Sequence, residues 1–219
     1  MYLQNIAHSV ETTNEIGRRV GEIAHSDDTI ALIDAGAIPF FTDAHIIDMV
    51  GLNDNHIAHL PGGFLSKYDN SYVLAQEPTY IHMHLVRYAN SWAPTDFIGS
   101  SALYYSAEFH QYYEQTSEIP YIFKRRQQPL TDDRVATFYG ANYQAKVPRS
   151  VIANTSILFP ITLVNNGYLL WQSHSLDAPW GAVRLVAEWR DTATGRTIST
   201  RTITLPRDVL PGDQLSFDI

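Results

Sequence analysis

The sequence predicts an α+β chain of two domains. An α/β layered domain is expected over residues 1–128, a linker or cross-over segment over 129–147, and a small β-sandwich over 148–219. Three observations predict this arrangement. Helical patterns alternate with short apolar runs in the first half. Helical signals do not return after Gln128. The last third consists of strand-length runs that are separated by turn residues.

The first domain begins with a helix that leads into a buried strand. Ser9 can cap a helix that runs to about His25, and Val10, Ile16 and Val20 recur on one of its faces. The apolar run TIALI follows this helix and has the length of a strand. Two further apolar runs, in HIIDMV and TYIHMHLV, continue the alternation of helix, loop and strand that is typical of α/β layers.

The second domain is predicted from alternating strands. In the run AVRLVAEWRD, Val183, Leu185, Ala187 and Trp189 face one side. Arg184, Glu188 and Arg190 face the other, with Val186 as an apolar exception. The turn DTATG joins this run to a second alternating run, TGRTISTRTITLP. Because Trp189 shares its side with core positions, the pattern places its indole in the core of the sandwich.

Composition excludes several classes of function. The chain has 219 residues, no cysteine and a formal net charge of -8. The lack of cysteine excludes disulfides and thiolate metal sites. The acidic balance argues against a duplex nucleic-acid partner, because no basic stripe is present to displace counterions from phosphates. The longest apolar runs are far shorter than the roughly 18 to 20 residues of a membrane-spanning helix. Since no secretory signal is visible, the chain is expected either to stay in the cytoplasm or to be a piece of a larger protein.

Linked motifs cover residues 29 to 81. The stretch TIALIDAGAIPFFTDAHIIDMVGLNDNHIAH is followed by KYDNSYVLAQEPTYI. In order and spacing these motifs resemble the extracytoplasmic region of bacterial GT-C type membrane glycosyltransferases, which use polyprenyl-phosphate sugars and include arabinofuranosyltransferase-like enzymes. That family often carries Gly-His-Glu before the Lys-Tyr-Asp, whereas this chain reads FLSKYD, so no role of that histidine is carried over.

The C-terminal part is similar to an immunoglobulin-like module, through VNNGYLLWQ, VRLVAEWRDTATGRTI and LPRDVLPGDQLSFDI. In such modules at least one more strand follows the proline-glycine turn, so the resemblance implies that a partner or further chain completes the sandwich. The catalytic acidic residues of the glycosyltransferases lie in loops tied to transmembrane helices. The resemblance therefore implies an accessory domain, with the transmembrane portion of a parent protein as its partner, rather than a reaction centre.

The segment IIDMVGLNDNHIAHLP carries the main candidate site. Its polar residues follow the end of a strand, where open α/β sheets place ligands, and are candidates to bind sugar hydroxyls or a cation: Asp48, Asn53, Asp54 and His56. The alternative is a structural corner, in which Gly51 permits a tight turn while Asn53 and Asp54 bond the backbone and cap a short helix. The sequence leaves both interpretations open.

Two other places attract a ligand hypothesis. His82 and His84 lie two apart on a predicted strand and share a face, but a metal site needs a third ligand, such as Asp43, His45 or His110. Among nine histidines such a pair is common, so no metal site is predicted. Trp180, in a predicted loop, is the candidate to stack on a sugar ring. LPGGFL lacks the features of a phosphate-binding loop, and no cofactor is predicted.

Three hypotheses follow. The first is a non-catalytic extracytoplasmic portion of a membrane glycosyltransferase, at the outer face of the bacterial cell membrane, which positions a glycan acceptor or a polyprenyl-phosphate-linked sugar donor. The second is a stand-alone cell-surface or assembly module that binds a protein or glycan partner through its β-domain, for example by accepting a strand at its sheet edge. The third is a metal-dependent hydrolase built on His82 and His84.

Overall fold

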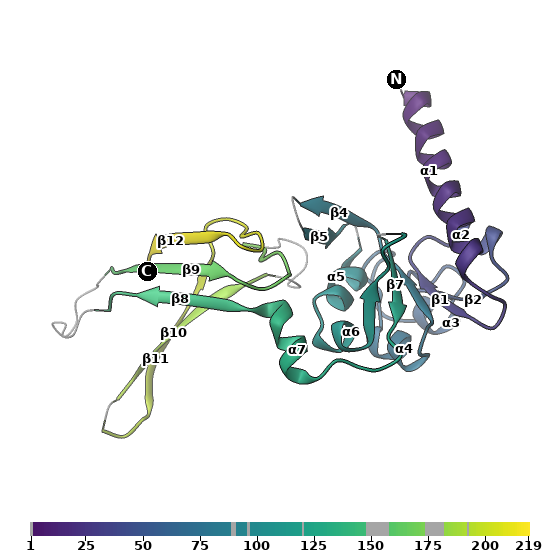
Figure 1. The fold of residues 1–219 in the computed structure, drawn as a ribbon. Coiled ribbons are helices and arrows are strands. Elements are labelled where there is room, and N and C mark those ends of the chain that lie inside the picture. Colours follow the sequence, from purple (N-terminus) through teal and green to yellow (C-terminus); the bar gives the residue numbers. More distant parts are fainter. Residues whose placement is uncertain are drawn as a thin grey trace. The chain divides into compact units, whose positions relative to one another are not determined.

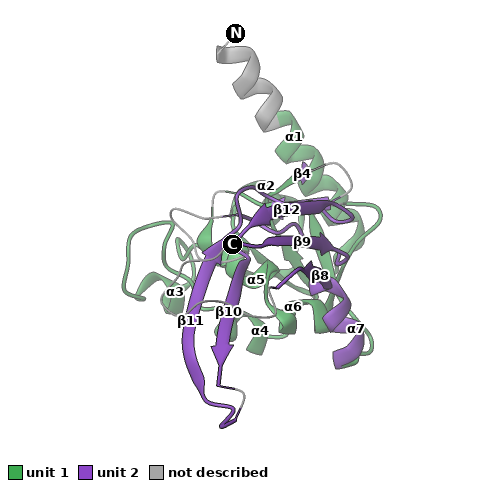
Figure 2. Ribbon diagram, turned by 90° about the vertical axis from the view of Figure 1, so that its left-hand side faces the viewer, with its two compact units in different colours: residues 1–86, 94–131 green, residues 87–93, 132–219 purple. Residues whose placement is uncertain are grey.

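The structure is a computed structural model that describes residues 2–88, 91–95, 97–119, 121–147, 158–173, 182–191 and 193–219. It is of mixed α and β composition, with mostly short helices and several small sheets (Figure 1), which agrees with the α+β class expected. The chain forms two compact units. Unit 1 comprises residues 1–86 and 94–131, and unit 2 comprises residues 87–93 and 132–219 (Figure 2).

A five-stranded mixed sheet in the order β2-β1-β3-β7-β6 is the centre of unit 1. Strand β1 pairs in parallel with β2 and β3, whereas β7 pairs antiparallel with β3 and β6. Three of the four residues of β1 are fully buried, as expected for the central apolar run TIAL. The bounds are β1 Thr29–Leu32, β2 His45–Asp48, β3 Tyr80–His82, β6 Tyr113–Gln115 and β7 Ile122–Arg125.

The long helix α1, Tyr2–Ile23, packs closely against the short helix α2, Ala37–Phe41. Two glycines of α1 permit this approach. A Cβ atom at Gly17 would lie 2.9 Å from the carbonyl oxygen of Ala37, and one at Gly21 would collide with that of Phe41. Below them, a cluster of buried apolar residues joins α1 and α2 to the sheet: Val20, Ile30, Leu32, Ile38, Tyr80, Ile119 and Ile122.

Unit 1 also contains four short helices, α3 to α6. The division between the two units falls within strands β4 and β5. Phe109 is fully buried and packs against the rings of Tyr104, Tyr113 and Phe123. Strands β4 and β5 form a two-stranded sheet, part of which clusters with unit 2, where Ser91 Oγ donates to the Tyr168 carbonyl. The bounds are α3 Asn55–Ala58, α4 Asn70–Ala75, α5 Ile98–Tyr104, α6 Ala107–Tyr112, β4 Leu85–Tyr88 and β5 Ser91–Pro94.

Unit 2 contains a three-stranded antiparallel sheet, in the order β12-β9-β8, and a separate two-stranded hairpin of β10 and β11. The inner face of the sheet and the base of the hairpin enclose a second core, which includes Ile161, Leu163, Trp171 and Val209. The stretch expected as a linker, 129–147, contains α7, η1 and β8. The bounds are α7 Asp132–Ala136, η1 Thr137–Tyr139, β8 Ala141–Ala145, β9 Pro160–Asn165, β10 Arg184–Arg190, β11 Thr197–Thr204 and β12 Gln214–Asp218.

One prediction about this core is wrong. Leu185 and Val183 pack against the core as expected, but Trp189 is 40% exposed. The side chains of β10 alternate as predicted, but the hairpin is longer than the core that it covers, so residues of the same face lie beyond the core. No helix in the described part of the chain is long and apolar enough to span a membrane.

Candidate functional site

The candidate segment begins with a tight turn that Asp48 organises. The Asp48 side chain is 2% exposed. Its Oδ1 accepts hydrogen bonds from the amides of Val50, at 3.0 Å, and Gly51, at 3.2 Å. Its Oδ2 accepts from the amide of Asn53 at 2.8 Å and from the Asn53 side chain at 3.4 Å. Both carboxylate oxygens therefore hold the turn that follows β2.

Gly51 has the conformation that this turn requires. Its φ is +82°, a region that residues with a Cβ rarely adopt. A Cβ atom here would also lie 2.8 Å from the Ala58 amide nitrogen, because the turn packs against α3. The tight turn predicted at Gly51 is confirmed.

Asp54 and Asp69 cap two neighbouring short helices in the same way. Asp54 Oδ1 accepts from the amide of Ile57 at the start of α3, and Asp69 Oδ1 accepts from the amide of Tyr72 at the start of α4. The predicted cap at Asp54 is thus confirmed. Asn53 differs from expectation, because its side chain bonds Asp48 and not its own backbone.

The second oxygen of each capping carboxylate reaches the other helix. Asp54 Oδ2 accepts from the Tyr72 hydroxyl at 3.0 Å, and Asp69 Oδ2 lies 2.9 Å from His56 Nε2. The rings of His56 and Tyr72 stack with their centroids 4.1 Å apart. Lys67 also donates to the Ala58 carbonyl at 2.7 Å. The motifs GLNDNHIAH and KYDNSY therefore bind one another, and we call this set of contacts the helix brace.

The charges in the helix brace follow from these bonds. The backbone amide of Tyr72, followed by the His56 side chain, lowers the pKa of the Asp69 carboxyl below its usual value. Burial, followed by the Asp54 carboxylate, raises the pKa of the Tyr72 hydroxyl. The His56 side chain is 44% exposed and the Asp69 side chain 33%, so His56 is the more accessible of the two.

The sequence indicated only part of the helix brace. Asp54 and His56 were candidates, but Lys67, Asp69 and Tyr72 were not. An available signal was the Asp-x-x pattern in KYDNSY, since an aspartate just before an apolar helical run is a typical N-cap. Most oxygens of these carboxylates already accept hydrogen bonds from the chain itself, so the geometry accounts for them as structural residues.

Among the described residues, no third ligand joins His82 and His84. His82 is buried and His84 is exposed, and their rings meet edge to face with centroids 5.3 Å apart. Burial, with a smaller contribution from His84, lowers the pKa of His82 to about 3, so its imidazole is neutral near pH 7. Within the described ranges, no group of three or more His, Asp or Glu side chains could hold a metal ion. Trp180 lies outside the described residues.

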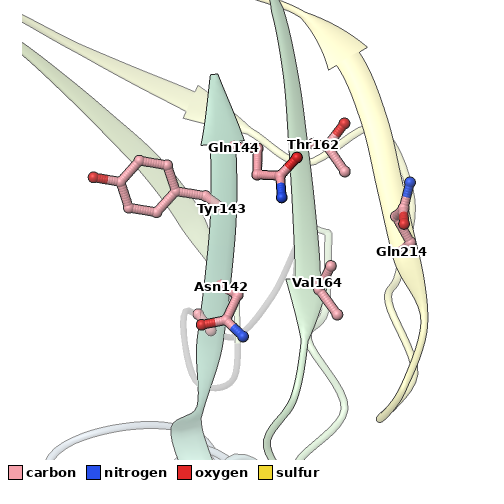
Figure 3. A pocket seen from close by; sticks show the side chains of 7 residues that line it. Asn142, Tyr143, Gln144, Thr162, Val164 and Gln214 are labelled. Carbon is pink, nitrogen blue, oxygen red and sulfur yellow. The ribbon is translucent and has the colours of Figure 1, made fainter. Parts of the chain in front are cut away.

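A cavity that sequence reasoning did not anticipate lies on the open face of the β8-β9-β12 sheet. Its volume is about 560 Å³, and its lining is uncharged. Register places Asn142, Val164 and Gln214 in one row across the three strands, and Gln144 and Thr162 in the next (Figure 3). Tyr143 also lines the cavity, points away from Gln144 in Figure 3, and is 72% exposed. We call this set of residues the amide face.

The amide face combines groups that both donate and accept hydrogen bonds. Each carboxamide offers an N–H donor pair and a carbonyl acceptor, and Thr162 adds a hydroxyl. Val164 supplies an apolar surface at the centre. The alternation in ANYQAK, with amides two residues apart, could have indicated a polar strand face from sequence, but the partner strands β9 and β12 are far away along the chain.

Comparison with known proteins gives one match. The profile of a protein family described as "Domain of unknown function (DUF8728)" matches residues 4–147. No curated protein and no solved structure matches the chain. The matched range contains the whole helix brace and, from the amide face, the residues of β8.

Proposed function

The chain belongs to the DUF8728 family, a domain of unknown function, and we propose that it is a non-catalytic extracytoplasmic portion of a membrane glycosyltransferase. In this role it positions a glycan acceptor or a polyprenyl-phosphate-linked sugar donor for catalysis elsewhere in the parent protein. The proposal joins two lines of support: the resemblance of residues 29–81 to GT-C type enzymes, and the amide face.

The amide face is the observation that carries the proposal. Asn142, Gln144 and Gln214 can each exchange donors and acceptors with sugar hydroxyls, and Val164 offers apolar surface to sugar C–H groups. Since no charged side chain lines the cavity, it suits a neutral sugar portion better than a phosphate group. This favours the glycan acceptor, or the sugar of the donor, as the bound part.

The helix brace supports a structural role for the motifs that carry the resemblance. Asp48 and Asp54 are engaged with backbone amides and Tyr72, so neither carboxylate is free to serve as a general acid or base in glycosyl transfer. For unit 2 we propose an immunoglobulin-like sandwich, in which the β8-β9-β12 sheet and the β10-β11 hairpin belong to opposite sheets. A stacking role for Trp180 belongs to the same proposal.

Glycan binding by the purified chain tests this function. We expect binding to neutral members of a printed oligosaccharide array, confirmed by titration calorimetry with the free sugar. Replacing Asn142 and Gln144 together by alanine removes two bidentate partners and should weaken binding at least tenfold, because each hydrogen bond to a neutral group contributes about 1 kcal/mol. Gln128→Ala, an exposed amide in unit 1, is the matched control. Equal binding by both variants, or transfer of sugar from a polyprenyl-phosphate donor by the chain alone, would contradict the proposal.

A second candidate function has its own observation. Among the described residues, β8 pairs only with β9, so its outer edge is free, and the strand ANYQA carries no charge that would protect it. This favours a stand-alone module that accepts a partner strand. Fractionation of source cells with an antibody against the chain separates the two functions. A membrane-bound band much heavier than 24.7 kDa supports the glycosyltransferase proposal, and a soluble band near 24.7 kDa supports the stand-alone module.

A further inference from the structure

The β10-β11 hairpin extends beyond the core of unit 2. At its base, Val183, Leu185 and Ile203 pack against the core cluster. From Val186 to the turn and back to Thr202, the described residues of both strands are almost all exposed. Figure 1 shows the β10 and β11 strands extending away from the β8, β9 and β12 strands. The distal hairpin therefore has two solvent-exposed faces.

Both faces of the distal hairpin carry large apolar side chains. Val186 is 54% exposed, Trp189 is 40% exposed and Ile198 is 71% exposed. Trp189 lies opposite Ser199, and Val186 lies opposite Thr202. Because successive side chains of a strand alternate, Trp189 projects from one face and Val186 from the other. Ile198 lies at the register shift between Trp189 and Arg190, where the regular alternation is interrupted. A groove on a protein covers one face of such a hairpin, whereas a lipid interface surrounds an inserted hairpin on every side.

The hairpin is also basic in an acidic chain. Four arginines, at positions 184, 190, 196 and 201, oppose Glu188 and Asp191, so the hairpin carries a net charge of +2. Since the whole chain carries -8, the remaining residues carry -10. Arg190 pairs with Glu188 at 2.7 Å. In the part of the chain that the structure describes, Arg196 and Arg201 form no ion pair, which leaves two cations beside the exposed Trp189 and Ile198.

The Asp191 side chain, near the tip of the hairpin, accepts hydrogen bonds from the residues of the turn. Asp191 Oδ1 accepts from the amides of Ala193 and Thr194 and from the Thr194 hydroxyl. Gly195, at φ +68°, completes the turn before Arg196. The tip is thus a hydrogen-bonded turn with an arginine on one side of it.

We propose that the distal β10-β11 hairpin binds the interface of an anionic lipid bilayer. Trp189 and Ile198 enter the boundary between headgroups and acyl chains, and Arg196 and Arg201 bind lipid phosphates. Arginine and tryptophan are the side chains that suit this boundary, and basic residues near an anionic leaflet each contribute about 1 kcal/mol. The -10 charge on the rest of the chain is repelled by the same surface, which orients the hairpin toward the lipid.

Flotation of the full chain with vesicles tests this inference. The probes are vesicles of phosphatidylcholine with about 30% phosphatidylglycerol, chosen to match a strongly anionic leaflet, and vesicles of phosphatidylcholine alone. We expect binding to the anionic vesicles that decreases as salt rises, and little binding to the neutral ones. Replacing Arg196 and Arg201 together by glutamine should weaken binding roughly 20- to 30-fold. Trp189→Ser with Ile198→Ser should weaken it several-fold even at low salt.

A matched control removes the same charge elsewhere. Arg134→Gln with Lys146→Gln lowers the net charge by the same two units on exposed positions of unit 2 and should leave vesicle binding nearly unchanged. Circular dichroism and the melting temperature establish that each variant is folded. The inference is overturned if the unaltered chain does not float with anionic vesicles at low salt, or if the hairpin variants bind them as well as the control.

The result is independent of the glycan proposal. The Asn142 and Gln144 variant should retain vesicle binding, and the hairpin variants should retain glycan binding. If the hairpin variants instead abolish a concentration-dependent dimer and leave lipid binding unaffected, the hairpin is a contact between copies of this chain, and the lipid inference is wrong.

Discussion

At the scale of single residues, Asp48 illustrates how a carboxylate that resembles a ligand-binding group can be required by the fold. It is almost completely buried, and backbone amides donate hydrogen bonds to both of its carboxylate oxygens. Such charge-assisted bonds compensate the cost of burying the charge. A side chain in this position is fully used before any ligand arrives.

We therefore expect Asp48→Asn to lower the free energy of unfolding by roughly 2–3 kcal/mol. An amide has one acceptor oxygen, so on one side of the turn its N–H2 group would face N–H donors. Urea unfolding at pH 7 measures the effect. Asp43→Asn, at an exposed position just before β2, is the control and should change stability by less than about 0.5 kcal/mol. Equal effects of the two substitutions would mean that the hydrogen bonds of Asp48 do not add to the free energy of unfolding.

A second prediction at this scale concerns acid sensitivity. Burial lowers the pKa of His82 from 6.5 to about 3 and that of His110 to about 4. Between these values and 6.5 the unfolded chain binds more protons than the folded chain, so stability decreases as pH falls through this window. From pH 7.5 to 5.5 each histidine should account for a loss on the order of 1 kcal/mol.

The measurement is the unfolding free energy of unit 1 at the two pH values. His82→Gln, which cannot titrate, should reduce the loss between pH 7.5 and 5.5 by about 1 kcal/mol, whatever its effect on stability at pH 7.5. His84→Gln is the comparison, because His84 is exposed. A loss that is unchanged in His82→Gln would show that His82 is hydrated in the folded protein.

At the scale of elements, the contact between α1 and α2 reverses an expectation from helix propensity. Glycine inside a helix is less favourable than alanine by about 1 kcal/mol, so propensity alone predicts that Gly21→Ala stabilises the protein. In the structure, the added methyl group would collide with the Phe41 carbonyl oxygen, which is part of the backbone and cannot rotate away. We expect Gly21→Ala to destabilise unit 1 by about 1–3 kcal/mol.

Thermal unfolding of Gly21→Ala and Glu22→Ala checks this sign. Glu22 is the next residue of the same helix and is exposed, so its replacement should change stability by less than about 0.5 kcal/mol. A higher melting temperature for Gly21→Ala than for the unaltered protein would mean that α1 does not pack on α2 in solution.

At the scale of the whole molecule, each unit contains a hydrophobic cluster of its own among the described residues. The cluster around Ile30 and Ile122 contains only residues of unit 1, and the cluster around Leu163 and Val209 contains only residues of unit 2. Each truncation should therefore act on the stability of its own unit. We expect Ile122→Ala and Leu163→Ala each to cost about 2–5 kcal/mol, and each to shift a different calorimetric transition.

Scanning calorimetry of the two variants decides this point. The unfolding of unit 2 can be followed in parallel through the fluorescence of Trp171, which belongs to its core. A single transition that both truncations shift by the same amount would contradict separate unfolding of the units.

Sequence reasoning recovered the elements that depend on neighbours along the chain. The α+β class, the strand at Thr29–Leu32, the turn at Gly51 and the cap at Asp54 all follow from local apolar runs and side chain to backbone bonds. It did not recover the burial of Trp189, because alternation gives the face of a strand but not how far the core extends beneath it. The function and partners inferred from the resemblance stay predictions.

The sequence by itself determined the strand at Thr29–Leu32, the turn at Gly51 and the cap at Asp54, because those features depend on side chains within a few residues. It did not indicate α7, since no helix was predicted after Gln128. Only the tertiary structure decided which distant side chains meet. Asp54 joins Tyr72 across eighteen positions, and Asn142 joins Gln214 through the register of β8, β9 and β12. These pairings depend on strand order and on the packing of separate elements, and neither leaves a periodic trace in the chain. The helix brace, the amide face and the exposed hairpin all arise at that level.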